Sequence, residues 1–236
     1  VVKKIPYDPR TINVTDINAI QKYWDNLPNY YGDKEENGLA IIDVSGSMTA
    51  NHCLPLYAAV GMGMYIADKA HGPFANHFIT FSEKPELVEM KGDNIVEKFN
   101  NITKAGWGWN TDLKAVFDLL LNVAVKKHLT QDELPDRLYI FSDMHFDSAF
   151  GFWRDKNQTF TLIDNIKRQW ERYGYKMPSI VFWNLNASAD IIPALDKTFS
   201  YVSGYSPVLV EQILSGKTNI ELMLDKLLSK RYENIK

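Results

Sequence analysis

Cysteine is almost absent from this sequence of 236 residues, since Cys53 is the only one. A single cysteine excludes an internal disulfide framework and a zinc site built from several thiolates. The sequence also lacks any apolar run near the roughly 18 residues that span a bilayer, so we expect no membrane partner. Basic residues are not in excess, because 26 Lys and Arg stand against 29 Asp and Glu. That balance argues against a protein whose main task is to grip nucleic acid.

The rest of the composition is that of an ordinary globular chain, with 45% hydrophobic, 13% aromatic and 23% charged residues. Soft limits of roughly 100–200 residues per domain predict one large domain, or one domain with an appendage. A lone cysteine and no evident signal peptide favour a cytoplasmic protein, or one inside a virion if its source is viral. We place Cys53, near the start of an apolar helical pattern, in the core rather than at a reactive site.

The first 37 residues differ in pattern from those that follow. Their apolar side chains recur at helical spacing, at Ile17, Ile20, Trp24 and Leu27. Thr15 or Asp16 can cap that helix with a side-chain oxygen. The sequence therefore predicts a lead-in segment with one helix, residues 1–37, packed on a main domain of residues 38–236.

In the main domain, short apolar runs alternate with longer helical patterns. The runs predict six strands, at residues 39–42, 77–81, 86–90, 138–141, 180–183 and 199–202. The helical patterns lie around residues 56–67, 93–100, 113–124, 162–170 and 218–228. Asp93 can cap the second of these helices, and Thr218 with Glu221 forms a capping box for the last. Strands separated by helices pair in parallel, so we expect an α/β fold: a doubly wound, mostly parallel six-stranded sheet with helices on both faces.

Carboxylates and hydroxyls follow two of the predicted strands and precede one helix. They are Asp43, Ser45 and Ser47 after the first strand, Thr111 before the helix at 113–124, and Ser142 and Asp143 after the fourth strand. In an open doubly wound sheet, ligands bind beyond the carboxyl ends of the strands, where the strand order reverses. Oxygen donors of this kind suit Mg²⁺ or Mn²⁺. Taken singly, each group fits a capped strand-to-helix turn equally well.

Taken together, these motifs resemble the von Willebrand factor A domain and its metal-ion-dependent adhesion site. The match consists of Asp43-Val-Ser-Gly-Ser-Met48, then Gly108-x-x-Thr111-Asp112, then Phe141-Ser-Asp143, and it covers the chain from Gly38 onward. The residues of these motifs are most similar to those of the A domain of TROVE (Ro autoantigen) proteins and of a TROVE-like uncharacterised family. The resemblance implies that Ser45, Ser47 and Thr111 contact the cation directly, and that Asp43 and Asp143 act largely through water. It also implies that a partner protein supplies an acidic side chain to the cation.

On that resemblance we expect a non-catalytic interaction domain and not an enzyme. The alternative from another class is a component of a ribonucleoprotein or viral particle, although the charge balance gives RNA binding no support. A metal-dependent phosphotransferase using Asp43 is the enzyme alternative, but it would need a second carboxylate where Ser45 stands. The sequence holds no complete dinucleotide fingerprint, P-loop or nucleophile-elbow motif.

Four neighbouring residues fit two roles each. His145 and Asp147 alternate after the fourth strand, as metal ligands do, but they fit caps of the next segment as well. Trp107 and Trp109 flank the loop of Thr111, where they fit either a recognition rim or ordinary packing over the sheet edge.

Overall fold

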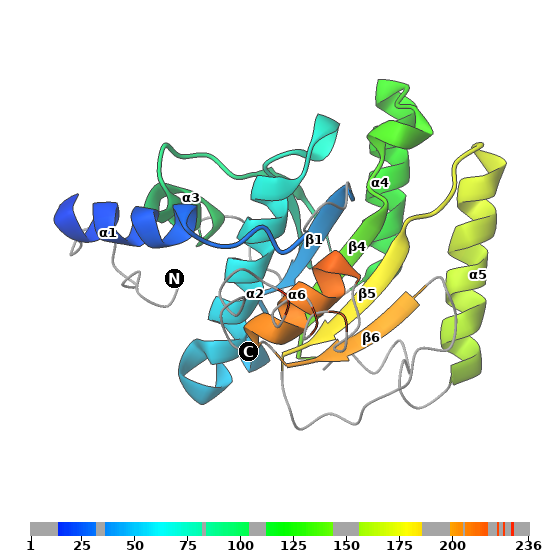
Figure 1. The fold of residues 1–236 in the computed structure, drawn as a ribbon. Helices are drawn as coiled ribbons and strands as arrows, with labels where there is room; N and C mark the ends of the chain where they lie inside the picture. Colours follow the sequence, from blue (N-terminus) through cyan, green and yellow to red (C-terminus); the bar gives the residue numbers. More distant parts are fainter. Residues whose placement is uncertain are drawn as a thin grey trace.

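A six-stranded sheet with the order β3-β2-β1-β4-β5-β6 forms the centre of the molecule (Figure 1). The computed structural model describes residues 14–31, 36–81, 84–103, 112–143, 156–185, 199–204 and 206–216, together with 221, 224 and 228. The strands are β1 (Gly38–Asp43), β2 (His77–Phe81), β3 (Leu87–Glu89), β4 (Arg137–Ser142), β5 (Ser179–Asn184) and β6 (Phe199–Ser203). Only the pairing of β3 with β2 is antiparallel. The predicted doubly wound, mostly parallel sheet is confirmed.

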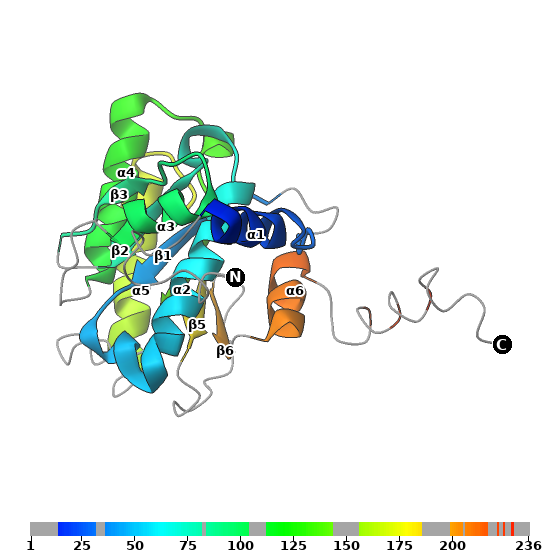
Figure 2. The same ribbon diagram turned by 90° about the vertical axis from the view of Figure 1, so that its left-hand side faces the viewer.

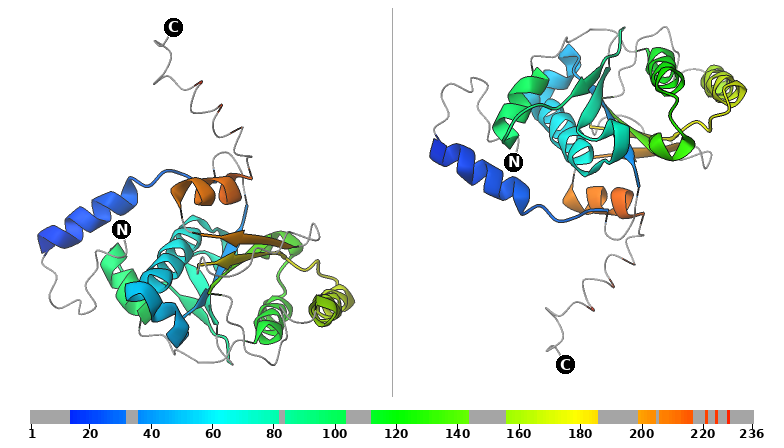
Figure 3. Two further views of the ribbon diagram at one scale, coloured as in Figure 1. Left: turned by 90° about the horizontal axis from the view of Figure 1, so that it is seen from below. Right: turned by 90° about the horizontal axis from the view of Figure 1, so that it is seen from above.

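Helices cover both faces of this sheet (Figures 2 and 3). One face carries α1 (Val14–Asp25), α2 (Ala50–Lys69), α3 (Ile95–Thr103) and α6 (Pro207–Ser215), and the other carries α4 (Leu113–Lys127) and α5 (Lys156–Arg172). Every residue of β1 is buried, as are all but the first residues of β4 and β5. Continuous apolar runs form these strands because parallel strands are covered on both faces. No helix among the described residues is long and apolar enough to cross a membrane.

The strand order reverses beside β1. The chain runs from β1 outward through β2 to the edge strand β3, and then returns to place β4 on the other side of β1. The register pairs Ile42 of β1 with Phe141 of β4, and Ser142 of β4 with Asn184 of β5. The carboxyl ends of these three strands are therefore neighbours at one edge of the sheet.

Two predicted helix starts were wrong by a residue or two. Helix α1 begins at Val14, so Thr15 and Asp16 lie in its first turn rather than before it. Helix α3 is capped by Asn94, whose Oδ1 accepts hydrogen bonds from the backbone N–H groups of Val96 and Glu97 at 3.1 and 3.0 Å. The predicted cap Asp93 instead donates its own N–H to Glu97, because the neighbouring asparagine already satisfies the first helical donors.

Helix α6 was not predicted from the sequence. Its signals are local: the Ser206 side chain accepts a hydrogen bond from Leu209 N at 3.2 Å, Pro207 occupies the first turn, and Gly216 ends the helix at a φ of 70°. The helix predicted at 218–228 lies outside the described residues except for positions 221, 224 and 228.

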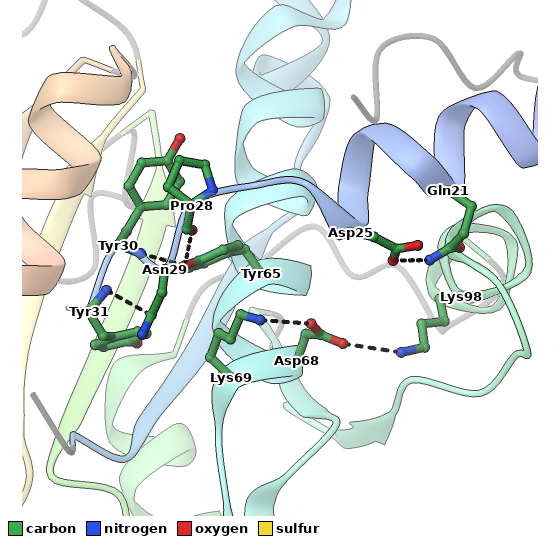
Figure 4. A network of polar contacts seen from close by, with 10 residues as sticks. All are labelled: Gln21, Asp25, Pro28, Asn29, Tyr30, Tyr31, Tyr65, Asp68, Lys69 and Lys98. Atoms are coloured by element: carbon green, nitrogen blue, oxygen red, sulfur yellow. Dashed lines mark hydrogen bonds and ion pairs between the residues drawn. The ribbon is translucent and has the colours of Figure 1, made fainter. Parts of the chain in front are cut away.

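Helix α1 and the residues that follow it are joined to the main domain by packing and by hydrogen bonds, of which Figure 4 shows those of Tyr65 with Pro28 and Tyr30. Ile20 and Trp24 lie in the same apolar cluster as α2 and α3. Gln21 Oε1 accepts a hydrogen bond from Ile95 N at 2.7 Å, so a side chain of α1 caps the start of α3. The Tyr65 hydroxyl of α2 donates to Pro28 O and accepts from Tyr30 N, at 2.9 and 2.8 Å. These contacts fix the segment that leads into β1.

Helix α2 approaches β1 closely at Gly63. A Cβ atom at this position would lie 2.4 Å from Cδ1 of Ile42, a side chain that is fully buried in the sheet. The missing side chain therefore sets the distance between α2 and β1. Near its start, α2 contains Cys53, which is half-buried with a φ of 61° and not in either apolar cluster, so its predicted place in the core was wrong.

Candidate metal centre

The carboxyl ends of β1 and β4 meet at the point where the strand order reverses. Asp43 ends β1 and Ser142 ends β4, and the Ser142 hydroxyl donates a hydrogen bond to Asp43 Oδ2 at 2.5 Å. Asp143 follows directly and leaves the sheet at the same edge. In an open, mostly parallel sheet, ligands bind beyond the carboxyl ends of the strands, at the point where the strand order reverses.

The loop after β1 turns back on its own carboxylate. Ser45 N donates to Asp43 Oδ1 at 2.8 Å, and Met48 N then donates to Ser45 O at 3.1 Å as a short 3₁₀ helix, Gly46–Thr49, begins. Met48 is fully buried and anchors the loop, whereas Ser47 is exposed. The hydroxyl oxygens of Ser45 and Ser47 lie 3.0 Å apart as a result. Two hydroxyls are thus held side by side above the carboxylate.

The two carboxylates are buried, which was not predicted from the sequence. Asp43 and Asp143 are each 2% exposed, because the strands that they follow lie at the centre of the sheet. Burial raises the pKa of Asp43, hydrogen bonds from Ser142 and Ser45 lower it, and the nearby charge of Asp143 raises it further. Two buried carboxylates that repel one another carry a desolvation cost that a bound cation would offset.

The donor set consists of oxygen atoms alone. Asp143 takes part in other interactions, yet its Oδ2 is buried and accepts no hydrogen bond from the described residues. Within the described ranges, no group of three or more His, Cys, Asp and Glu side chains could hold a metal ion. A cation here would depend on the hydroxyls of Ser45 and Ser47, on two carboxylates, and on water. That chemistry fits Mg²⁺ or Mn²⁺ better than a softer metal.

Four of the five predicted ligands, Asp43, Ser45, Ser47 and Asp143, lie at this edge. The fifth, Thr111, lies outside the described residues, as do Trp107, Trp109, His145 and Asp147. The residue that follows Thr111, Asp112, caps α4 by accepting a hydrogen bond from Ala115 N at 3.0 Å.

One further polar residue at the same edge was not predicted from the sequence. Asn184 ends β5, is fully buried, and pairs in register with Ser142. Its Nδ2 donates a hydrogen bond to the Tyr201 hydroxyl of β6 at 2.8 Å. A signal was present, because Asn184 comes directly after the apolar run at 180–183, just as Asp43 and Ser142 come directly after theirs.

Comparison with known proteins gives one family and one viral relative. Residues 37–234 match the family described as Domain of unknown function (DUF7788). The uncharacterized protein L728 of Acanthamoeba polyphaga mimivirus is 32% identical over 203 residues, which are 84% of this chain and 34% of that protein. The chain therefore spans about a third of the length of this relative.

Solved structures place the fold. The Deinococcus radiodurans RO (RSR) protein superposes with a TM-score of 0.50 at 15% identity, over 87% of this chain and 39% of that one. The SpRpn10 VWA domain matches with a TM-score of 0.43 at 12% identity, over 78% of this chain and 96% of that one. The predicted resemblance to the A domain of TROVE proteins is confirmed as a likeness of fold. The chain belongs to the family described as Domain of unknown function (DUF7788), and its fold is that of a von Willebrand factor A domain.

Proposed function

We propose that this chain is a non-catalytic protein-interaction module that binds one Mg²⁺ or Mn²⁺ and captures an acidic side chain of a partner protein. Ser45, Ser47 and Thr111 would hold the cation directly, and Asp43 and Asp143 would act largely through water. The bound cation would supply a positive centre for a carboxylate from outside. The chain supplies the oxygen donors and the buried edge on which they stand.

One observation carries this proposal: two buried carboxylates lie beside two hydroxyls at the reversal point of the sheet. The Ser142 hydroxyl and the Ser45 N–H both donate to Asp43, which orients its two oxygens. Burial first, and then the nearby charge of Asp143, raise the pKa of Asp43 and so disfavour its ionised form in the absence of a cation. The exposed hydroxyl of Ser47 lies on the solvent side of this pair, where a ligand arrives.

The other candidate functions have less support. A role in a viral particle gains one observation, because the 32% identical relative is a mimivirus protein. RNA binding gains none from the charge, since the net charge is −3. A phosphotransferase using Asp43 would still need an acid–base group where Ser45 stands.

Calorimetric titration with Mg²⁺ and with Mn²⁺ tests the metal site. We expect one ion per chain, and at a free concentration 100 times Kd a gain of about 2.7 kcal/mol in unfolding free energy that EDTA reverses. Ser47→Ala should abolish the heat of binding, and Ser179→Ala, which removes a hydroxyl at the first residue of β5 and so at the opposite end of the strands, should leave it unchanged. No heat at millimolar metal from a chain with an intact circular-dichroism spectrum would refute the proposal.

Thr111→Ala tests the capture of a carboxylate separately from the metal. Mn²⁺-loaded protein is titrated with acetate, and displacement of metal-bound water is followed by water-proton relaxation. We expect acetate binding to weaken more than Mn²⁺ binding, because Ser45, Ser47 and the two aspartates remain. Equal losses of Mn²⁺ affinity and acetate affinity would mean that Thr111 is only another metal ligand. Retention of both affinities would mean that its loop is not part of the site.

A further inference from the structure

Polar side chains form a row along the carboxyl edge of the sheet. In register, Ser142 of β4 pairs with Asn184 of β5, and Asn184 pairs with Ser203 of β6. The residues two positions earlier in β1, β4 and β5 all pack in the apolar cluster of α4 and α5, and they are Ile41, Ile140 and Phe182. Side chains two apart on a strand share a face. Asp43, Ser142 and Asn184 therefore point to the same face, which is the face of α4.

Within this row, Asn184 is the amide beside Ser142, two strands away from Asp43. It is fully buried, so its side chain belongs to the interior of the edge and not to solvent. The Tyr201 hydroxyl accepts a hydrogen bond from its Nδ2 and fixes the amide. The backbone is fixed on both sides as well, because Leu185 N donates to Ser142 O and Gly204 N donates to Asn184 O, each at 2.9 Å.

We infer that Asn184 sets the charge of the metal centre and thereby its specificity for an acidic partner. This rests on the proposed function. Among the described residues of this edge, an amide at position 184 keeps the number of carboxylates at two, Asp43 and Asp143, whose charge balances that of a divalent cation without exceeding it. Aspartate has the same shape as asparagine and would add a third negative charge to the row. The cation would then be held more tightly, while an incoming carboxylate would meet net negative charge.

The test is the variant Asn184→Asp, measured in two titrations. We expect the Kd for Mg²⁺ to fall by about tenfold and the Kd of the Mn²⁺-loaded protein for acetate to rise by about tenfold. Opposite changes of this kind are the signature of charge, because damage to the structure would weaken both. Asn101→Asp is the matched control, since it adds the same charge on α3, over the opposite face of the sheet.

A second variant keeps the inference testable if Asn184→Asp does not fold. Ser203→Asp places the carboxylate one strand further along the row, at a half-buried position, and should give both changes with smaller size. Unchanged Mg²⁺ affinity in folded Asn184→Asp, or equal changes in Asn101→Asp, would overturn the inference and leave the metal site standing. Failure of the unmodified chain to bind Mg²⁺ would overturn both.

Discussion

At the carboxyl end of β1, the exposed and the buried donors differ in what their loss would cost. Ser47 is exposed, and its hydroxyl contacts that of Ser45. Asp43 is 2% exposed and accepts hydrogen bonds from both the strand beside it and the loop after it. The hydroxyls can therefore change without disturbing the core, whereas a large change at Asp43 would leave buried donors unsatisfied.

The change Asp43→Asn separates binding from folding. An amide keeps the volume and an acceptor for Ser45 N, and it removes the buried charge that Asp143 repels. We expect Mg²⁺ affinity to drop at least about tenfold, while the unfolding free energy in EDTA stays equal or rises. Calorimetry and urea denaturation measure the two quantities, with Ser47→Ala as the variant that should lose metal at unchanged stability. A large loss of stability in Asp43→Asn would mean that the carboxylate serves the fold.

The residue types and the order of the motif predicted Asp43, Ser45, Ser47 and Asp143 as neighbours. Burial of the two carboxylates was not predicted, because a residue that follows an apolar run can sit inside or outside the edge of a sheet. That choice depends on how central the strand is, and only the strand order decides it. Asn184 was not predicted as part of the edge for the same reason: its place there follows from pairing with Ser142 of the neighbouring strand, which depends on the strand order.

Among the elements, α1 and α3 depend on each other. Gln21 reaches from α1 to the first N–H group of α3, and its Nε2 donates to Asp25 at 2.7 Å. Lys98 of α3 pairs with Asp68 of α2 at 3.4 Å, at a partly buried position. The lead-in helix α1 therefore supplies a hydrogen-bond acceptor to the start of α3, in addition to packing against the domain.

Replacing Gln21 with methionine tests this dependence. The side chain keeps its length but loses the acceptor for Ile95 N, which leaves a helix donor without a partner. We expect the unfolding free energy to fall by about 1 kcal/mol, as for the loss of a helix cap. Lys22→Met, at an exposed position on the same helix, is the control and should stay within about 0.5 kcal/mol. Equal stability of Gln21→Met and the original chain in urea denaturation would show that the Gln21 hydrogen bond does not stabilise the start of α3.

Four tyrosines at the junction of the lead-in segment make the fold sensitive to alkali. Burial is the main cause of the raised pKa of Tyr30, Tyr31, Tyr65 and Tyr139. A raised pKa means that the neutral hydroxyl is favoured in the folded chain, so its contribution is complete below about pH 10 and is lost above it. Each tyrosine that stays protonated in the folded state lowers the unfolding free energy by about 1.4 kcal/mol per pH unit.

Urea denaturation between pH 8 and about pH 11.5 measures this loss. Tyr31→Phe should make the alkaline decline shallower by about 1.4 kcal/mol per pH unit, since its buried hydroxyl faces the charge of Glu36. Tyr23→Phe is the control, because Tyr23 is exposed on α1. An identical slope in all three chains would show that other groups cause the decline.

Long apolar periodic segments predicted the strands and most helices, because burial on two faces leaves a strong pattern. Helix α6 was missed because its nine residues give too short a pattern, and only the Ser206 cap and Gly216 mark it. The cap of α3 was assigned to Asp93 instead of Asn94, since both residues can cap and the competition is decided by backbone geometry.

For the whole molecule, the packed core extends beyond the residues that the family match covers. The family match begins at residue 37, whereas Ile20 and Trp24 are 5% and 9% exposed within the core cluster. Just before that boundary, Glu36 accepts a hydrogen bond from Tyr139 and pairs with Arg137 at 3.4 Å. The segment before β1 thus supplies part of the interior of the domain.

A chain that begins at Gly38 tests this directly against one that begins at Val14. Each buried large apolar side chain contributes about 1.5–3 kcal/mol, so the shorter chain should lose on the order of 5 kcal/mol or fail to unfold cooperatively. The chain from Val14 should keep one sharp thermal transition. Equal melting temperatures for the two would show that α1 rests on the domain without stabilising it.

The loop that carries Ser45 and Ser47 depends on Gly63, a position that contributes no side-chain atom to the site. Helix α2 starts directly behind that loop and runs for 20 residues, about 30 Å, so a methyl group wedged against Ile42 would shift the loop as well. A survey of substitutions scored by metal affinity alone would rank Gly63 beside Ser47. Thermal unfolding in EDTA separates the two positions. Loss of the Ser47 hydroxyl should leave the melting temperature unchanged, whereas a methyl group at position 63 should lower it.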